Sequence, residues 1–392
     1  MAYQPFLSYK REDRRAIDQL RKELTLRGAG GWQDLRDAPL GQRWKAVFKR
    51  AIGRDTGGFI WWGTRRSLSS WTIRKLEIPR ALRRNRRRWG PPYPVIPLFL
   101  DLSPGEDEPE IRAVLGRRRS SQLLDLQGEV RGSGETIAAF ARRAARRYVR
   151  DLIRSHGDRP LTVAITGDRE LTGEHDLCLD WRPLLDGNGR LIDEAVIPDL
   201  VQTLADIREA AQSVTRMPEI VVEPHLRLPL AALVGWEWNA ARPVSLVVSQ
   251  RTDDRFIEVP ATPTVEPDLS DLRTERLNGD GPAILAVSVG KDLGATVSRY
   301  ATDKNARSTM HLHVSTAGDA THALSAAEIA GLATWSINRL AEMNAAGYAK
   351  HLLILGPGSL AVRIGTGANG TGRTYVPFWD GAAGYRSGVL IG

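Results

Sequence analysis

The stretch "GPPYPVIPLFLDLSP", residues 90–104, sets the fold class of the first part of the chain. An unbroken apolar run ends in an acidic residue, Asp101, and then in Pro104. Near-continuous apolar strands belong to sheets that are covered on both faces. Similar runs alternate with amphipathic segments back to the N-terminus, so a doubly wound, parallel α/β domain is predicted.

The same alternation places the other elements of this domain. The apolar periodicity predicts helices wherever apolar residues recur every three or four positions. Strands are expected at residues 3–9, 30–35, 56–63, 93–101 and 120–127, and helices at 12–28, 43–53, 77–85 and 135–155. We expect this domain to span residues 1–152, with a linker at 153–160.

Length and composition limit the class of protein that the chain can be. A chain of 392 residues with 42% apolar residues suits two or three packed domains. Cys178 is the single cysteine, which leaves no disulfide framework, and no apolar run reaches the ~18 residues of a membrane span. The N-terminus lacks a secretory signal pattern, so a cytoplasmic protein without membrane contact is expected.

The chain is strongly basic, with a formal net charge of +9 carried mostly by arginine. Arginine forks suit phosphate, so the excess is typical of proteins that handle nucleotides, nucleic acid or an acidic partner. A solvated helix face is an equally good interpretation of any one cluster. The clusters lie at residues 83–89, 116–121 and 142–154.

Beyond residue 160 the sequence repeats itself. Residues 160–168 resemble residues 282–292, and residues 229–248 resemble residues 357–379. In the second pair, an apolar segment leads to a glycine, Gly235 or Gly365, and then to Asn239 or Asn369 four residues later. The repeat predicts two α/β units in tandem, at about 161–275 and 276–392. Their strand ends are expected to form one pocket, because ligands of open α/β sheets bind beyond the carboxyl ends of strands.

Four segments of the first domain occur together in an order that resembles the TIR family. They are "PFLSYKRED" (5–13), "WQDLRDAPLGQRW" (32–44), "GGFIWWGTRRSLSSWTIRKLEIPRAL" (57–82) and "PVIPLFLDLSP" (94–104). The resemblance implies a flavodoxin-like parallel sheet. It also implies cleavage of the nicotinamide–ribose bond of NAD+, with Glu77 as the catalytic residue. From spacing alone, Glu77 is more typical of a surface glutamate at a helix start, since Pro79 is tolerated only in a first helical turn; the TIR resemblance favours the catalytic role instead.

The TIR resemblance implies further residues around the nucleotide. NAD+ is substrate here, and neither a cofactor nor a metal is expected. Trp71 departs from the family pattern, because it lies six rather than four residues before Glu77. One of Trp61 and Trp62 is expected in the core and the other on a base. The implied NAD-binding residues are Ser8, Tyr9, Lys10, Asp34, Arg36, Gly41, Trp62 and Trp71.

Residues 161–392 resemble the SAVED family, two fused CARF-like (Rossmann-like) units that bind cyclic oligonucleotides. The segment "HLLILGPGSLAVRIGTGANGTGRTYVPFWD" (351–380) carries the resemblance best. Backbone amides and Lys291 are expected to hold phosphates, and the tryptophans to stack on bases or to pack in the core. The implied ligand-binding residues are Thr166, Gly167, Asp168, Trp236, Trp238, Ser288, Gly290, Lys291, Asp292, Gly358 and Ser359.

Together the resemblances predict a TIR–SAVED effector of a bacterial CBASS antiphage system. A cyclic oligonucleotide, such as the cyclic trinucleotide cyclic tri-adenylate, is expected to drive filament-like oligomerisation that switches on NAD+ cleavage. One alternative is a non-enzymatic TIR scaffold assembled by a cyclic nucleotide. A second, nucleic-acid binding through the arginine clusters, is disfavoured, and no direct DNA or RNA target is expected.

Two motifs are set aside. "GTGANG" (365–370) has GxGxxG spacing, but the strand that is expected to follow it is not the helix that a dinucleotide site needs. His311 and His313 share a strand face, but without a third ligand the pair is more typical of structure than of zinc binding.

Overall fold

The computed structural model describes most of the chain, in two compact units. The described residues are 4–33, 44–86, 93–126, 128–168, 175–186, 191–239, 244–252, 255–315, 324–379 and 384–392. The first unit comprises Met1–Val163, Thr172–Asp180 and Glu209–Thr215, and the second comprises Ala164–Leu171, Trp181–Arg208 and Arg216–Gly392. Each unit is described by itself.

The first unit contains the predicted parallel sheet. Its strands lie in the order β1-β2-β3-β4, and every pair is parallel. They are β1 (Pro5–Ser8), β2 (Gly58–Gly63), β3 (Val95–Phe99) and β4 (Glu129–Val130). Trp32 bridges Phe6 in parallel, so the expected second strand survives as a single bridge among the described residues. The second segment therefore pairs with the first rather than with the third along the chain, which is the flavodoxin-like order.

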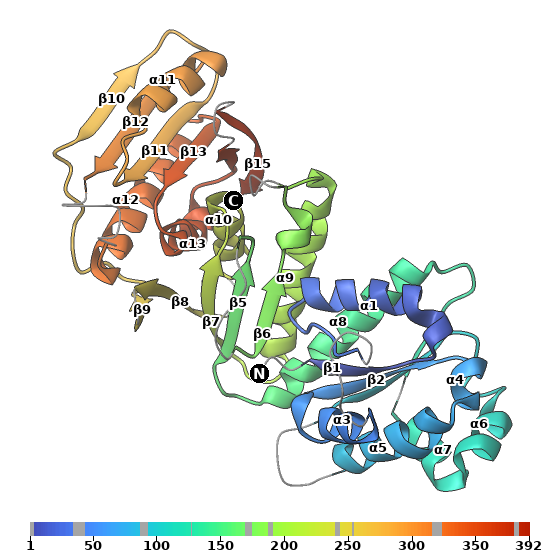
Figure 1. The fold of residues 1–392 in the computed structure, drawn as a ribbon. Helices are drawn as coiled ribbons and strands as arrows, with labels where there is room; N and C mark the ends of the chain where they lie inside the picture. The colour runs from blue at the N-terminus through green and yellow to red at the C-terminus, as the bar shows by residue number, and fades with distance from the viewer. Residues whose placement is uncertain are drawn as a thin grey trace. The chain divides into compact units, whose positions relative to one another are not determined.

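Helices cover both faces of this sheet, as the apolar runs predicted (Figure 1). One face carries α1 (Arg14–Leu26) and α8 (Ile137–His156), and the other carries α3 (Trp44–Arg50), η2 (Ala51–Asp55) and α5 (Ile78–Asn85). Side chains along β2 alternate between these layers. Phe59 and Trp61 belong to the core cluster that also contains Ile78 of α5, whereas Trp62 packs against Phe140 of α8.

The fifth strand expected at residues 120–127 is wrong. This segment lies largely in a helix, α7 (Arg117–Leu124), and the fourth strand of the sheet is β4 instead. Ser120 and Leu123 are its buried residues, a spacing of three that suits a helix and not a strand. Other short helical segments were not expected: α4 (Arg65–Ser69), η3 (Ile73–Glu77) and α6 (Glu108–Leu115), whereas η1 (Arg11–Asp13) leads into the helix that was expected at 12–28.

The rest of the chain confirms the internal repeat. Two sheets have the orders β6-β5-β7-β8-β9 and β10-β12-β11-β13-β14-β15. Apart from the extra edge strand β10, the orders correspond strand for strand. The first sheet contains β5 (Leu161–Thr166), β6 (Leu177–Asp180), β7 (Glu219–His225), β8 (Ser245–Thr252) and β9 (Arg255–Val259). The second contains β10 (Leu272–Arg276), β11 (Ala283–Val289), β12 (Ser308–Val314), β13 (Lys350–Leu355), β14 (Thr374–Trp379) and β15 (Tyr385–Ile391).

The longer helices of the two repeats are α9 (Ile197–Gln212), α10 (Leu228–Glu237), α11 (Gly294–Asp303), α12 (Ala326–Ala345) and α13 (Gly358–Gly367), with short turns η4 (Arg182–Leu184), η5 (Glu194–Val196) and η6 (Ala368–Gly370). By their place between the strands, α9 corresponds to α12 and α10 to α13, whereas α11 has no counterpart among the described residues. In both sheets the last strand, β9 or β15, is antiparallel to its neighbour. Two copies of one α/β unit are thus present, as predicted.

The two repeats meet where α10 crosses α13. A Cβ added to Gly235 would lie 2.0 Å from the Val362 carbonyl oxygen, and one added to Gly365 would lie 2.1 Å from that of Ala232. Each glycine faces the residue three positions before its counterpart, so the contact is reciprocal. The two glycines of the sequence repeat therefore allow two backbones to touch. The paired asparagines do not correspond, because Asn239 is buried and Asn369 is exposed.

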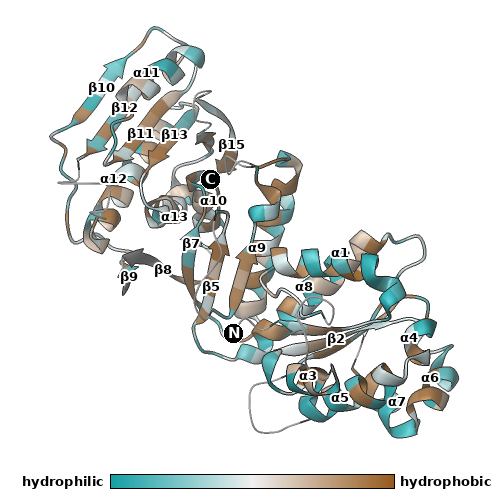
Figure 2. Cartoon of the chain, viewed as in Figure 1, coloured by the Kyte–Doolittle hydropathy of each residue, from teal (hydrophilic) through white to brown (hydrophobic). Residues whose placement is uncertain are grey.

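Hydropathy separates core strands from the outer edge (Figure 2). Strand β11 is apolar and buried, whereas β10, at the edge of the same sheet, is hydrophilic and mostly exposed. Charged residues on an edge strand discourage pairing with other chains. Within the described ranges, no helix combines the length and the apolar character needed to cross a bilayer.

Candidate active site and candidate sensor site

A wide helical turn positions Glu77. Residues Ile73–Glu77 form a π-helical turn, in which the Ile78 N–H bonds to the Ile73 carbonyl, and α5 begins directly after it. Pro79 falls in the first turn of α5, because it has no N–H to donate and its ring would clash inside a regular helix. The prediction that Glu77 stands at a helix start does not fit, because helical turns from Trp71 run into α5 without a break and Glu77 lies within this longer helical segment. Such π turns occur frequently at functional sites.

Glu77 is buried at the carboxyl end of β1. The Ser8 hydroxyl donates a hydrogen bond of 2.6 Å to Glu77 Oε2, and only 5% of Glu77 and 1% of Ser8 are exposed. Ser8 ends β1, so the sheet fixes the donor while the π turn fixes the acceptor. The structure thus joins two residues that the sequence placed 69 positions apart in one candidate site.

Polar groups that the sequence did not single out continue along the same edge of the sheet. Thr64 follows β2, and its hydroxyl donates to Asp13 at 3.2 Å. Asp101 follows β3 and accepts a 2.9 Å hydrogen bond from the backbone N–H of Arg65. Burial raises the pKa of the Asp13 carboxyl, against the opposing hydrogen bond from Thr64. All three strand ends therefore present polar groups where ligands of open α/β sheets bind.

The other residues predicted to bind NAD+ are distributed unevenly. Tyr9 and Lys10 are half-buried directly after Ser8, so they remain beside the candidate site. Three predicted residues lie outside the described ranges: Asp34, Arg36 and Gly41.

The two predicted tryptophans differ in burial. Trp62 is fully buried against Phe140, as Trp61 is buried on the opposite face of the sheet, so neither indole offers a face to a base. The prediction of one core and one stacking tryptophan does not fit this arrangement. Trp71 is 54% exposed with the Lys45 ammonium 5.3 Å from its ring, whereas Glu77 is buried. The role of Trp71 beside Glu77 therefore stays a prediction.

In the second unit, predicted ligand residues from both repeats are close together. The Gly167 N–H, directly after β5, donates to the His225 carbonyl at the end of β7 at 2.7 Å. On the other side of that strand end, a Cβ added to Gly358 would lie 3.0 Å from the Pro224 carbonyl oxygen. The end of β7 thus links the loop after β5 in one repeat to the start of α13 in the other.

The predicted residues in these loops differ in exposure. Thr166 and Ser359 are buried, while Asp168 is exposed. Gly358 is the first residue of α13, so the N-terminal end of that helix adjoins these loops.

A buried hydroxyl and two histidines adjoin the end of β11. Ser288 Oγ lies 2.8 Å from His311 Nε2 and 3.1 Å from His313 Nδ1. The ladder places Ser288 opposite His313, and the two histidines share its face of the sheet. Burial lowers the pKa of His311, which keeps its ring neutral. The pair set aside as a zinc motif therefore belongs to a hydrogen-bonded cluster around a predicted ligand residue.

The neighbouring loop carries the remaining predicted residues. Gly290 has a φ of +79° and Lys291 is exposed, so the loop presents a positive charge to solvent. Asp292 accepts from Arg273 at 2.7 Å and from the Gly294 N–H at 2.7 Å, and Arg273 holds the pKa of the Asp292 carboxyl below its usual value. These contacts give Asp292 a role in shaping the loop rather than in meeting an anion.

The sensor tryptophans divide between core and surface. Trp238 is fully buried, and its indole N–H donates to the Leu204 carbonyl at 2.9 Å, so packing describes it and stacking on a base does not. Trp236 is half-buried. No group of three or more His, Cys, Asp or Glu side chains in the described residues is arranged to hold a metal ion.

The architecture defines a two-part α/β protein: a parallel sheet with a buried carboxylate at its carboxyl edge, followed by a duplicated α/β unit. Residues 6–142 match the TIR domain family model. Residues 201–391 match the model of the SMODS-associated and fused to various effectors sensor domain, SAVED. The chain therefore belongs to the TIR–SAVED fusion proteins, as the motifs predicted.

Solved structures with a similar fold are distant. Cap4 SAVED/CARF-domain containing receptors of Acinetobacter baumannii match with 12% identity and a TM-score of 0.47, one with the cyclic trinucleotide 3'3'3'-cAAA (80% of this chain, 84% of that one) and one with 2'3'3'-cAAA (99% and 80%). A Cap4 receptor of Moraxella osloensis matches with 13% identity and a TM-score of 0.46 (89% and 84%). At this distance the likeness does not bear on the ligand of this chain. No curated protein matches it.

Proposed function

We propose that the TIR domain cleaves the nicotinamide–ribose bond of NAD+, with Glu77 as the catalytic carboxylate. The observation that carries the proposal is the hydrogen bond from Ser8 to Glu77 at the carboxyl end of β1. A carboxylate held in place by a fixed donor is preorganised to act on developing charge. The TIR family model supports the substrate, since its enzymatic members act on this bond.

The chemistry needs one well-placed anion. As the bond between the ribose C1′ and the pyridinium nitrogen breaks, its electron pair leaves with nicotinamide and positive charge develops on the ribose. The Glu77 carboxylate stabilises that oxocarbenium-like centre. Water then adds to C1′ and loses a proton, which gives ADP-ribose.

We propose further that a cyclic oligonucleotide, such as a cyclic trinucleotide, activates this reaction by binding to the SAVED domain. Two features support control by a ligand. Only 5% of Glu77 is exposed, so NAD+ reaches its carboxylate only after a rearrangement. The end of β7 in one SAVED repeat meets the start of α13 in the other at Pro224 and Gly358, where one ligand can contact both. A ligand that favours the open state shifts the population toward it.

Self-association is the proposed route of activation. A ligand bound to one subunit completes a surface for the next, and head-to-tail contacts of this kind grow into filaments unless they close into a ring. An enzyme that is activated in this way depletes NAD+ only after its ligand is made, which suits an antiphage effector.

The test is release of nicotinamide from NAD+ by the purified full chain, with cyclic di-, tri- and tetranucleotides added one at a time and particle size recorded in parallel. Glu77→Gln should lower the rate by at least 10²-fold, because it removes the charge but keeps the shape. Glu266→Gln is the matched control, since Glu266 is exposed and belongs to the second unit. Full activity of Glu77→Gln would refute the catalytic role, and growth in size without NAD+ loss would favour the scaffold alternative.

A further inference from the structure

A basic cavity lies between α5 and the helix formed by α3 and η2, and its described lining residues include neither Glu77 nor Ser8. It has a volume of about 590 Å³, within the range of small-molecule sites. Six of the eight described residues that line it are cationic, and the other two are small. The lining residues are Ala46, Lys49, Arg50, Gly53, Arg54, Arg80, Arg83 and Arg84, and we call this cavity the basic pocket.

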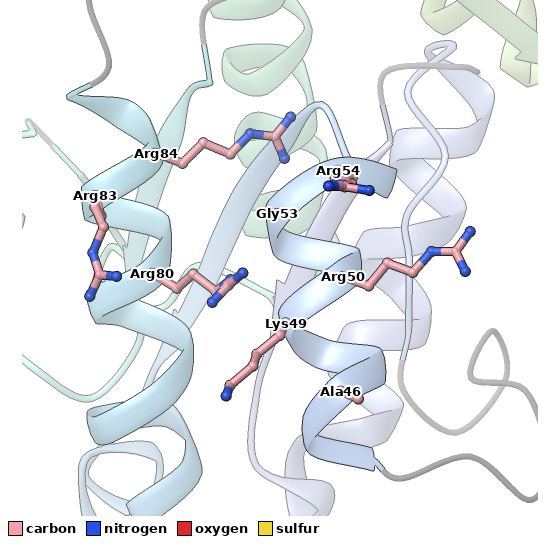
Figure 3. Close-up of a pocket in the computed structure, with 8 residues that line it drawn as sticks. All are labelled: Ala46, Lys49, Arg50, Gly53, Arg54, Arg80, Arg83 and Arg84. Atoms are coloured by element: carbon pink, nitrogen blue, oxygen red, sulfur yellow. The ribbon is translucent and has the colours of Figure 1, made fainter.

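The cations that face the pocket come from both helices (Figure 3). Arg80 and Lys49 extend into the gap from opposite sides, and Arg84 reaches across one end of it, whereas Arg50 is directed away from α5. The Arg84 guanidinium donates to the Ile52 carbonyl at 2.6 Å and stacks 4.0 Å from the Tyr93 ring, so it is already held in place.

Arg80 is the centre of this arrangement. A Cβ added to Gly53 would lie 3.2 Å from Arg80 Nη2, so the missing side chain of Gly53 makes room for the guanidinium. Arg80 Nε is buried, and no described group accepts a hydrogen bond from it. A buried donor that lacks a partner in the protein is satisfied when a ligand supplies an acceptor.

The charges of the pocket oppose helix stability. Arg80, Arg83 and Arg84 are three and four residues apart on α5, and like charges at these spacings destabilise a helix. Among the described residues, Lys49, Arg54, Arg80 and Arg83 have no ion-pair partner. Arginines elsewhere in this domain do have partners, such as Arg147 with Asp151 at 2.8 Å. These four unpaired cations therefore favour the binding of an anion that the chain itself does not supply.

We propose that the basic pocket binds a compact anion of two or more linked phosphates. Three cations directed into one cavity exceed the charge of a single phosphate, and arginine forks bind phosphate oxygens in pairs. Of the described lining residues, none is aromatic, so the phosphates rather than a base are recognised. The bound anion connects η2 to α5, the helix that begins directly after Glu77.

The test is isothermal titration calorimetry of the full chain with pyrophosphate, tripolyphosphate, ADP and ATP, with chloride used to hold the ionic strength constant. Binding is expected to weaken about tenfold or more in Arg80→Gln and less in Arg80→Lys, which keeps the charge but loses the fork. Arg14→Gln is the matched control, because the Arg14 side chain is 63% exposed on α1, and it should bind as the parent does. A nucleotide that binds over tenfold tighter than its inorganic counterpart would identify nucleotides as the source of the phosphates.

Three results would overturn the proposal. The first is no binding of any of the four anions at millimolar concentration. The second is equal binding by Arg80→Gln, provided that the melting temperature of the unliganded variant matches that of the parent. The third involves a second basic cavity, on α5 and α7, which includes Arg118. If duplex DNA binds more tightly than tripolyphosphate, and Arg118→Gln weakens it as much as Arg80→Gln, the surface is a nucleic-acid interface instead. Because the readout is binding, failure here is separate from any failure of NAD+ cleavage.

Discussion

Substitution of Gly235 by alanine tests the helix crossing that joins the two SAVED repeats. The new Cβ would lie 2.0 Å from the Val362 carbonyl oxygen, whereas ordinary contacts begin at 3.4 Å. The helices must therefore separate locally by about 1.4 Å. Overpacking of this kind costs about 1–3 kcal/mol, and the upper end applies because the obstacle is backbone. Alanine is also about 1 kcal/mol more favourable than glycine inside a helix, which offsets part of this cost. The net prediction is a loss of about 2 kcal/mol.

Differential scanning calorimetry of the full chain measures this loss as a fall of about 4–8 °C in the melting temperature of the second unit. Gly365→Ala should behave alike, since its Cβ would lie 2.1 Å from the Ala232 carbonyl oxygen. The double variant should lose less than the sum, because one separation of the helices relieves both clashes. Gly370→Ala, with open space around its Cβ, is the control and should change little. An increase in the melting temperature of Gly235→Ala would refute the reasoning.

Two other substitutions have defined outcomes. Ser8→Ala should slow nicotinamide release about tenfold or more, because it leaves the Glu77 carboxylate buried without its 2.6 Å donor. Ser69→Ala, which removes an exposed hydroxyl bonded to the Arg66 carbonyl, should leave the rate unchanged, and equal rates for both variants would disconnect Ser8 from catalysis. Burial lowers the pKa of His351 to about 4, and its Nδ1 lies 2.9 Å from the Tyr300 hydroxyl. As the pH falls, His351 is therefore protonated at a lower pH in the folded state than in the unfolded state. Its contribution to the free energy of unfolding should be fully present above about pH 6.5 and should fall by about 1 kcal/mol as the pH drops toward 4, after allowance for partial exposure. His351→Asn should flatten that part of the melting-temperature profile, and an unchanged profile would show that His351 does not titrate there.

The order of the elements was predictable from the sequence where periodicity was strong. Apolar strands and the long helix α8 were found because their patterns are local. The segment at residues 120–127 was misassigned because a short apolar run fits a strand and a buried helix equally well. The repeat predicted the correspondence of the two SAVED sheets. It also identified Gly235 and Gly365, although not the helix contact that explains them, in which a close approach of two backbones favours glycine.

The Glu77 site was predictable only in part. Motifs identified Ser8 and Glu77 separately. Their hydrogen bond depends on the π turn at Ile73–Glu77, which no local sequence pattern predicted. Trp62 was misjudged for a related reason. A strand covered on both faces buries neighbouring residues on opposite sides, so neither member of a tryptophan pair within it is left for a ligand.

The cluster of Ser288, His311 and His313 could not be predicted from motifs, because it depends on how two strands pair. Ser288 was chosen from a loop motif, and His311 with His313 was judged as a metal motif and set aside. The register of β11 with β12 places Ser288 opposite His313, and the period of two along a strand then puts His311 on the same face. No local signal fixes that register, because β11 is buried along nearly its whole length and either of its faces fits a core. The histidines are therefore explained by the serine hydroxyl between them, and a third metal ligand is not needed to account for their spacing.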